Sequence, residues 1–133
     1  MPPPREAVRR VTPMLHVPDI DAALRWYESI GFEVRNTAKD DGDTVWAMMG
    51  FGDGLVMLNV GGQPSAAPRR EVDLYVETER IDELYASLKG RVDVVEPPHD
   101  TFYGMREFIV RDLNRFWVTF GERIPTGSGG GPL

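Results

Sequence analysis

The fold is decided by the stretch from Tyr103 to Glu122, YGMREFIVRDLNRFWVTFGE. Residues 106–110 and 116–120 predict two strands around a turn, because both segments contain aromatic and β-branched residues, which favour strands. The stretch carries an adjacent arginine and glutamate but no cysteine or histidine. Three interpretations are open at this point: the rim of an enzyme active site, the wall of a ligand pocket, or only the last hairpin of a small fold.

The N-terminal half of the chain predicts a strand, a helix and three further strands. A strand over 11–17 is followed by Asp19, a favourable N-cap, and by a helix with one apolar face that Gly31 ends. That face carries apolar residues at helical spacing, namely Ile20, Ala23, Leu24 and Tyr27. The strands that follow are expected to begin at residue 32 and to cover 44–49 and 55–60.

The same order of elements then repeats after a linker of Gly- and Pro-rich composition, residues 61–70. A strand over 72–78 precedes a second helix, which Gly90 ends. The apolar positions of this helix again follow helical spacing, at Ile81, Leu84, Tyr85 and Leu88. The remaining strands are expected over 92–95, 106–110 and 116–120.

This repetition predicts an α+β fold of two βαβββ modules, about 11–60 and 71–122, within a single domain over 1–133. One helix covers only one face of each sheet, so the other face must be buried or used. We expect the two modules to form an open half-barrel whose concave side is the ligand site. The Gly-rich tail over 126–133 is expected to be flexible.

Composition excludes several classes of function. The net charge of −6 argues against nucleic acid as a partner and permits a cationic ligand. The chain has no cysteine, which excludes thiolate nucleophiles, disulfides and Cys-based zinc sites. No apolar run is long enough to span a membrane, and the N-terminus does not predict a signal peptide, so we expect a cytoplasmic location.

The motifs DIDAALRWYESIGFEV and REFIVRD, with TPMLHVPD and IDELYASL, make residues 11–122 resemble the vicinal oxygen chelate superfamily. That group contains glyoxalases, extradiol dioxygenases, fosfomycin-resistance enzymes and bleomycin resistance proteins, and the last are the most similar. The resemblance implies a homodimer that exchanges its first strand, with Pro13 at the crossing. The chain departs from the family in its final turn, which has Asp112-Leu113-Asn114-Arg115 where relatives have Asp-Pro-Asp/Ala-Gly.

The resemblance also implies where a metal would be bound in the enzymes of the superfamily. Those four strand positions correspond to Thr12, Met57, Asp73 and Thr119. Only the aspartate is a good ligand, and catalytic metals typically need about three protein ligands. We therefore expect no metal, no cofactor and no catalytic residue. Of the two histidines, His16 shares the parity of Thr12 and can line the cleft, whereas His99 is expected in an exposed Pro-rich loop.

Strand parity predicts a ligand site on the concave face instead. An Asp53-Gly54 turn sets Met48 opposite Asn59 and brings Trp46 to that face. In the second module, Asp73 brings Tyr75 and Glu77 with it, and Thr119 brings Trp117. The predicted ligand-binding residues are His16, Trp46, Met48, Met57, Asn59, Asp73, Tyr75, Phe102, Tyr103 and Trp117. The alternative is that some of these aromatic residues fill a core or a dimer interface.

The Arg106-Glu107 pair has two interpretations. We expect Glu107 in a cross-strand ion pair at a sheet edge, while Arg106 either does the same or anchors an anionic ligand group.

The leading hypothesis is antibiotic resistance by non-covalent sequestration of a bulky aromatic antitumour drug, such as bleomycin. The alternatives are a metal-dependent glyoxalase-like lyase or dioxygenase, and a cofactor-free enzyme with His16 or Asp73 as general base.

Overall fold

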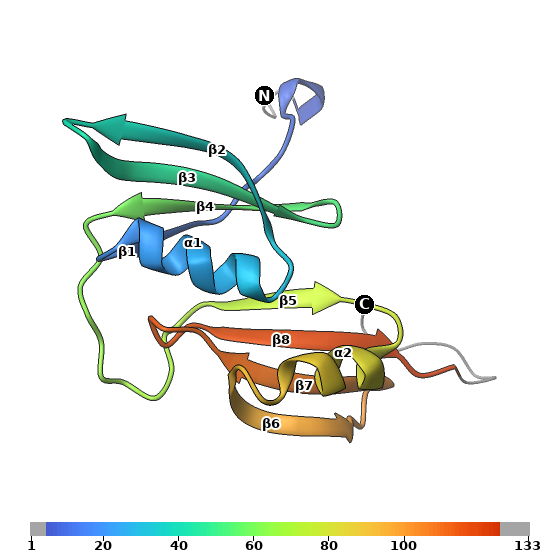
Figure 1. The fold of residues 1–133 in the computed structure, drawn as a ribbon. Coiled ribbons are helices and arrows are strands. Elements are labelled where there is room, and N and C mark those ends of the chain that lie inside the picture. The colour runs from blue at the N-terminus through green and yellow to red at the C-terminus, as the bar shows by residue number, and fades with distance from the viewer. Residues whose placement is uncertain (1–4, 126–133) are drawn as a thin grey trace. The chain divides into compact units, whose positions relative to one another are not determined.

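A computed structural model describes residues 5–125, which divide after Pro64 into two compact units (Figure 1). A short 3₁₀ turn, Arg5–Ala7, precedes the first unit's strands. None of the helices in this described part of the chain is long and apolar enough to cross a membrane. The predicted tail over 126–133 lies outside the described residues, and the single domain over 1–133 stays a prediction.

The first unit is a four-stranded sheet with one helix (Figure 1). Its elements are β1 (Met14–Val17), α1 (Ile20–Ser29), β2 (Glu33–Asp40), β3 (Asp43–Phe51) and β4 (Gly54–Val60). The strand order is β1-β4-β3-β2, with β1 parallel to β4 and the other pairs antiparallel.

The second unit repeats this topology (Figure 1). Its elements are β5 (Asp73–Glu77), α2 (Ile81–Leu88), β6 (Asp93–Asp100), β7 (Met105–Arg111) and β8 (Trp117–Arg123). The order β5-β8-β7-β6, again with only the first pair parallel, matches the first sheet strand for strand. Both sheets are open, which confirms the α+β class and the twice-repeated βαβββ order.

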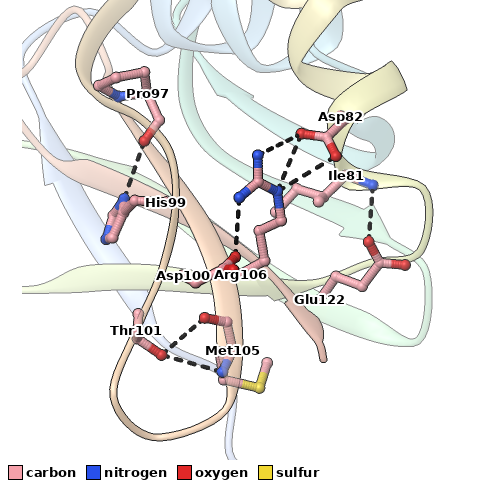
Figure 2. Close-up of polar contacts among 9 residues, drawn as sticks. All are labelled: Ile81, Asp82, Pro97, His99, Asp100, Thr101, Met105, Arg106 and Glu122. Carbon is pink, nitrogen blue, oxygen red and sulfur yellow. Dashed lines mark hydrogen bonds and ion pairs between the residues drawn. The ribbon is translucent and has the colours of Figure 1, made fainter. Parts of the chain in front are cut away.

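The two helices begin in different ways. The side chain of Asp19 caps α1 as predicted, accepting a hydrogen bond from the Ala22 amide at 3.1 Å. The residue before α2 is Arg80, which has a left-handed backbone conformation (φ 54°). Its side chain forms no capping hydrogen bond. The Glu122 carboxylate of β8 replaces it, accepting from the amides of Arg80 at 3.0 Å and Ile81 at 3.2 Å; Figure 2 shows the bond to Ile81.

The core of each unit lies between its helix and one face of its sheet. In the second unit, Phe108 and Phe120 stack with ring centroids 4.7 Å apart, and Tyr85 of α2 packs edge-on against Phe108. Burial alternates along β1 and β4, as period two predicts, whereas β7 and β8 also bury residues on the side away from the helix, such as Glu107 and Thr119. The buried residues on the helix side are Ala47, Met49, Val56 and Leu58 in the first unit, and Leu74, Phe108, Val110, Val118 and Phe120 in the second. We call the opposite face of each sheet its open face.

The predicted β3–β4 turn is wrong by one residue. Gly52 and Asp53 form the turn, because Phe51 pairs with Gly54. The register therefore sets Met48 opposite Met57 rather than opposite Asn59. This difference of two positions preserves strand parity, so Trp46 and Met48 stay on the face where they were expected.

The Pro-rich loop predicted around His99 is also wrong. Strand β6 continues through Pro97 and Pro98 to Asp100, with irregular register between Glu96 and His99. Proline lacks a donor for the sheet ladder and is tolerated here because β6 is an edge strand.

The unusual final turn is held by its first residue. One carboxylate oxygen of Asp112 accepts from the amides of Asn114 at 2.7 Å and Phe116 at 2.9 Å. Arg115 has φ 73°, the left-handed region in which the family pattern places glycine. The turn thus closes with a residue that is strained at this position.

Candidate ligand-binding site

A hollow of about 520 Å³ opens on the open face of the second unit's sheet. Of the predicted site residues, it brings together Asp73, Tyr75, Phe102, Tyr103 and Trp117. Residues that were not predicted for the site complete the lining, namely Arg69, Glu96, His99, Thr101, Glu107 and Ile109, together with Thr119. Glu77 does not line it but lies at the end of β5, where Tyr75 still experiences its charge.

At the base of the hollow, the Glu107 carboxylate accepts two phenol hydrogen bonds. Tyr75 donates to one carboxylate oxygen and Tyr103 to the other, both at 2.7 Å. Only 4% of Glu107 is exposed. The predicted ion pair of Glu107 at a sheet edge is therefore wrong, because the side chain is buried and turned to the open face. We call Tyr75, Tyr103 and Glu107 the Glu107 trio.

The trio raises the pKa of both phenols. For Tyr75, burial is the largest cause, followed by the hydrogen bond to Glu107 and its charge. For Tyr103, the hydrogen bond to Glu107 is the largest cause, followed by burial. Both effects favour the neutral phenol, so each tyrosine keeps the proton that it donates to Glu107.

Gly121 of β8 makes room for the trio. A Cβ atom at this glycine would lie 2.0 Å from the Tyr75 hydroxyl oxygen. Any side chain there would push the phenol off its position, because that distance is far below van der Waals contact. The absence of a side chain at Gly121 is therefore what lets Tyr75 reach Glu107.

A protein cation already covers part of the wall. The Arg69 guanidinium lies over the Trp117 ring, 4.0 Å from its centroid, and forms an ion pair with Asp73. The Trp117 indole N–H donates to the Pro68 carbonyl at 3.2 Å, which holds this segment against the ring. The wall thus accommodates a planar cation by cation–π attraction and charge.

The loop between β6 and β7 forms the rim. The Thr101 hydroxyl closes it by donating to the Met105 carbonyl at 2.8 Å and accepting from the Met105 amide at 3.1 Å (Figure 2). Phe102 at its tip is fully exposed and meets the Tyr103 ring edge-on at 5.1 Å. An exposed ring beside the hollow is available for contact with a ligand.

Arg106 belongs to the other face of β7. Figure 2 shows its guanidinium between Asp82 of α2 and Asp100 of β6, with N–O distances of 3.1 and 2.9 Å. Hydrogen bonds to both carboxylates raise its pKa. Ion pairing, the simpler of the two interpretations, therefore describes Arg106, and it does not line the hollow as an anion anchor.

The other predicted site residues lie in the first unit, on the open face of its sheet. Trp46 pairs with Asn59, Met48 with Met57, and His16 with Asn59 from the other side. His16 is exposed and the other four are half-buried. The structure thus places Trp46, Met48, Met57, Asn59 and His16 on one surface, and their role in binding stays a prediction.

Glu107 was not predicted as a site residue, although strand parity places it on the open face. Thr119 was expected on the open face, and in the observed register it pairs with Ile109. Glu107 lies two residues before Ile109 and so shares its face. Arg69 and Gly121 gave no comparable signal, because their positions depend on where the linker and Tyr75 lie in three dimensions.

Within residues 5–125, no group of three or more His, Asp or Glu side chains is arranged to hold a metal ion. Of the positions that the resemblance assigned to metal ligands, Asp73 pairs with Arg69, and Met57 and Thr119 lie in their sheets. These residues do not fit a bound metal.

Comparisons with known proteins agree with this fold. The family described as the Glyoxalase/Bleomycin resistance protein/Dioxygenase superfamily matches residues 9–120. No curated protein sequence matches the chain.

Several solved structures share the fold. TioX from Micromonospora sp. ML1 is 24% identical, with 88% of this chain and 100% of that chain covered and a TM-score of 0.71. A bleomycin-binding protein complexed with bleomycin is 16% identical, with coverages of 87% and 99% and a TM-score of 0.67. A glyoxalase/bleomycin resistance protein/dioxygenase from Nocardioides is 16% identical, with coverages of 97% and 93% and a TM-score of 0.69. At these identities the similarity concerns the fold.

Proposed function

The chain belongs to the glyoxalase/bleomycin resistance protein/dioxygenase superfamily, and on that basis we propose that it binds a bulky, partly aromatic small molecule without changing it. Binding lowers the free concentration of the molecule by mass action. The fraction of the molecule that is bound therefore rises with the affinity and with the concentration of the protein. The superfamily includes both enzymes and non-enzymatic binders, and this chain is proposed to be one of the latter.

The observation that carries the proposal is the composition of the hollow. Its lining combines the rings of Trp117, Tyr75 and Tyr103 with the exposed Phe102 at the rim. Aromatic rings offer flat contact area at low conformational cost. Both phenols are hydrogen-bonded to Glu107 and Asp73 is paired with Arg69, which favours a binding role over a catalytic one for these groups.

For the ligand we propose bleomycin or another large aromatic antitumour natural product, which makes the biological role antibiotic resistance. A protein of the same fold has been solved in complex with bleomycin, which supports this choice.

We also propose that the chain acts as a homodimer in which the first strand is exchanged. Strand β1 is an edge strand, and it pairs with β4 of its own unit over Met14 to Val17. A partner's β1 can occupy the same position with the same pairing, so the exchange costs little. Light scattering coupled to size-exclusion chromatography tests this: a mass near 15.0 kDa would contradict the dimer.

Tryptophan fluorescence titration against a panel of DNA-damaging antibiotics tests the binding function. We expect stoichiometric quenching by at least one drug, which mass spectrometry then recovers unchanged. Trp117→Phe should remove most of the quenching, whereas Trp26→Phe, a helix residue packed on Tyr27, should not. Turnover of the drug, or activity that depends on an added divalent metal, contradicts the proposal.

A further inference from the structure

The carboxylate of Glu107 is nearly buried beneath a hollow that is open to solvent. Among the ion pairs of residues 5–125, none includes Glu107. Its two contacts are the phenol hydroxyls of Tyr75 and Tyr103. A carboxylate in this setting is stabilised by hydrogen bonds but lacks a partner of opposite charge, which is unusual for a buried acid.

The hydrogen-bond directions leave the trio with acceptor groups only. Each phenol donates its one hydroxyl proton to a Glu107 oxygen, so the phenol oxygen itself can act only as an acceptor. Each carboxylate oxygen accepts one bond and retains capacity for another. The raised pKa of both tyrosines keeps these protons in place at neutral pH. A ligand group that meets the trio must therefore be a donor.

We propose, building on the binding function above, that the ligand carries a protonated amine or amidine, and that the Glu107 trio is the element that recognises it. The cationic nitrogen donates to the acceptor oxygens of the trio while the attached aromatic system lies along Trp117. Charge-assisted hydrogen bonds of this kind are about twice as strong as neutral ones, so we expect the trio to select cationic ligands over neutral ones.

The rest of the lining agrees with a cationic ligand. Three carboxylates line the hollow, those of Asp73, Glu96 and Glu107, against the cation of Arg69 and the imidazole of His99. Arg69 already pairs with Asp73, and His99 lies 3.4 Å from Glu96. An anionic ligand group would meet an excess of acidic oxygens, whereas a guanidinium already rests on the Trp117 wall.

Three probes with one ring system and different charges test the proposal: 2-naphthamidine (cationic), 2-naphthamide (neutral) and 2-naphthoate (anionic). Calorimetric titration of the full chain at pH 7 should give a dissociation constant for the amidine roughly tenfold or more below that of the amide. The naphthoate should bind most weakly. This comparison needs no variant and decides the charge preference by itself.

Two variants then assign the preference to the trio. Glu107→Gln keeps the shape and removes the charge, so amidine affinity should fall to that of the amide, while amide affinity changes by less than about twofold. Tyr103→Phe removes one acceptor and should give a smaller loss. Glu83→Gln, the same change on exposed α2, should have no effect. A melting curve establishes that each variant is folded.

The outcomes separate the two proposals. Equal binding of amidine and amide overturns the cation inference and leaves the binding function standing. A preference for the amidine that survives in folded Glu107→Gln overturns the assignment to the trio. If none of the probes binds, and no drug of the antibiotic panel binds either, both proposals fail.

Discussion

The two units have the same topology, and their helix-covered faces are built from the same kind of apolar residues, yet their open faces differ. The first unit presents thioethers, an indole and an amide, from Met48, Met57, Trp46 and Asn59. The second presents phenols, carboxylates and a guanidinium around the Glu107 trio. The two units thus share one topology but present different chemical groups on their open faces.

The two faces of each sheet are under different physical constraints. The helix side must be filled by close-packed apolar groups in either unit, so its pattern persists. The open side has no such requirement and can take polar groups that form directional bonds. Thioethers adapt to many shapes, whereas a carboxylate held by two phenols selects donors. We expect the open face of the first unit to accept varied apolar groups and that of the second to select hydrogen-bond donors.

The largest expected effect should be the same in both units. Phe120→Ala in the second unit and Leu58→Ala in the first each empty a fully buried position on the helix side. Each should lower the free energy of unfolding by about 2–5 kcal/mol, measured by urea denaturation. A loss in only one unit would mean that the two helix-covered faces are not equivalent after all.

The next largest effect is expected in the second unit and not in the first. Gly121→Ala introduces a methyl group that displaces the Tyr75 hydroxyl from Glu107. The affinity for 2-naphthamidine should fall roughly tenfold, since a charge-assisted acceptor site is lost. The matched change Gly54→Ala in the first unit meets only an ordinary contact, 3.5 Å from the Phe51 carbonyl oxygen, and should leave affinity unchanged. Retained affinity in Gly121→Ala would refute the role of this glycine.

Removing the guanidinium from the hollow should strengthen binding of cations. Arg69→Gln frees the Trp117 ring and Asp73, so 2-naphthamidine should bind about two- to fivefold more tightly by calorimetry. Arg35→Gln removes a cation from the first unit, where it pairs with Glu33, and serves as the control. Weaker binding by the Arg69 variant would show that this side chain contributes to the site instead of competing for it.

The backbone at two turns offers a smaller test. Arg115→Gly relieves a left-handed residue (φ 73°) and should raise the free energy of unfolding by about 0.5–1 kcal/mol. Asp41→Gly, at φ 51° in the first unit, should raise it less, because aspartate tolerates this conformation better than arginine. Urea denaturation of both variants makes the comparison, and an equal or reversed order would contradict it.

The smallest effect is confined to alkaline solution. Because the pKa values of Tyr75 and Tyr103 are raised in the folded state, their contribution to stability is complete below the ordinary tyrosine value of about 10. As the pH rises past that value, the unfolded chain loses protons that the folded chain keeps, so stability falls. Guanidinium denaturation at pH 8 and pH 11 should show a larger loss for the wild type than for Tyr75→Phe. Equal losses would contradict the assignment.

Most of the fold was predictable from the sequence because its signals are local. The Asp19 cap and the apolar spacing from Ile20 to Tyr27 each lie within about ten residues, and the structure confirms them. The β6 strand was cut short because the prolines suggested a loop, and only its edge position makes them tolerable. Glu107 was assigned to an edge ion pair because its hydrogen-bond partner Tyr75 lies 32 residues away in the sequence, and local alternation does not reveal that contact.

The cap of α2 has a consequence for how the chain is made. Helix α1 is capped by Asp19, which accepts a hydrogen bond from the amide three residues further on, so this cap needs no distant part of the chain. Helix α2 waits for Glu122, which is 42 residues downstream of Arg80, and its first turn is finished only after the final hairpin has emerged. The start of α1 is therefore completed within its own segment of chain, whereas the start of α2 is completed only when β8 is in place.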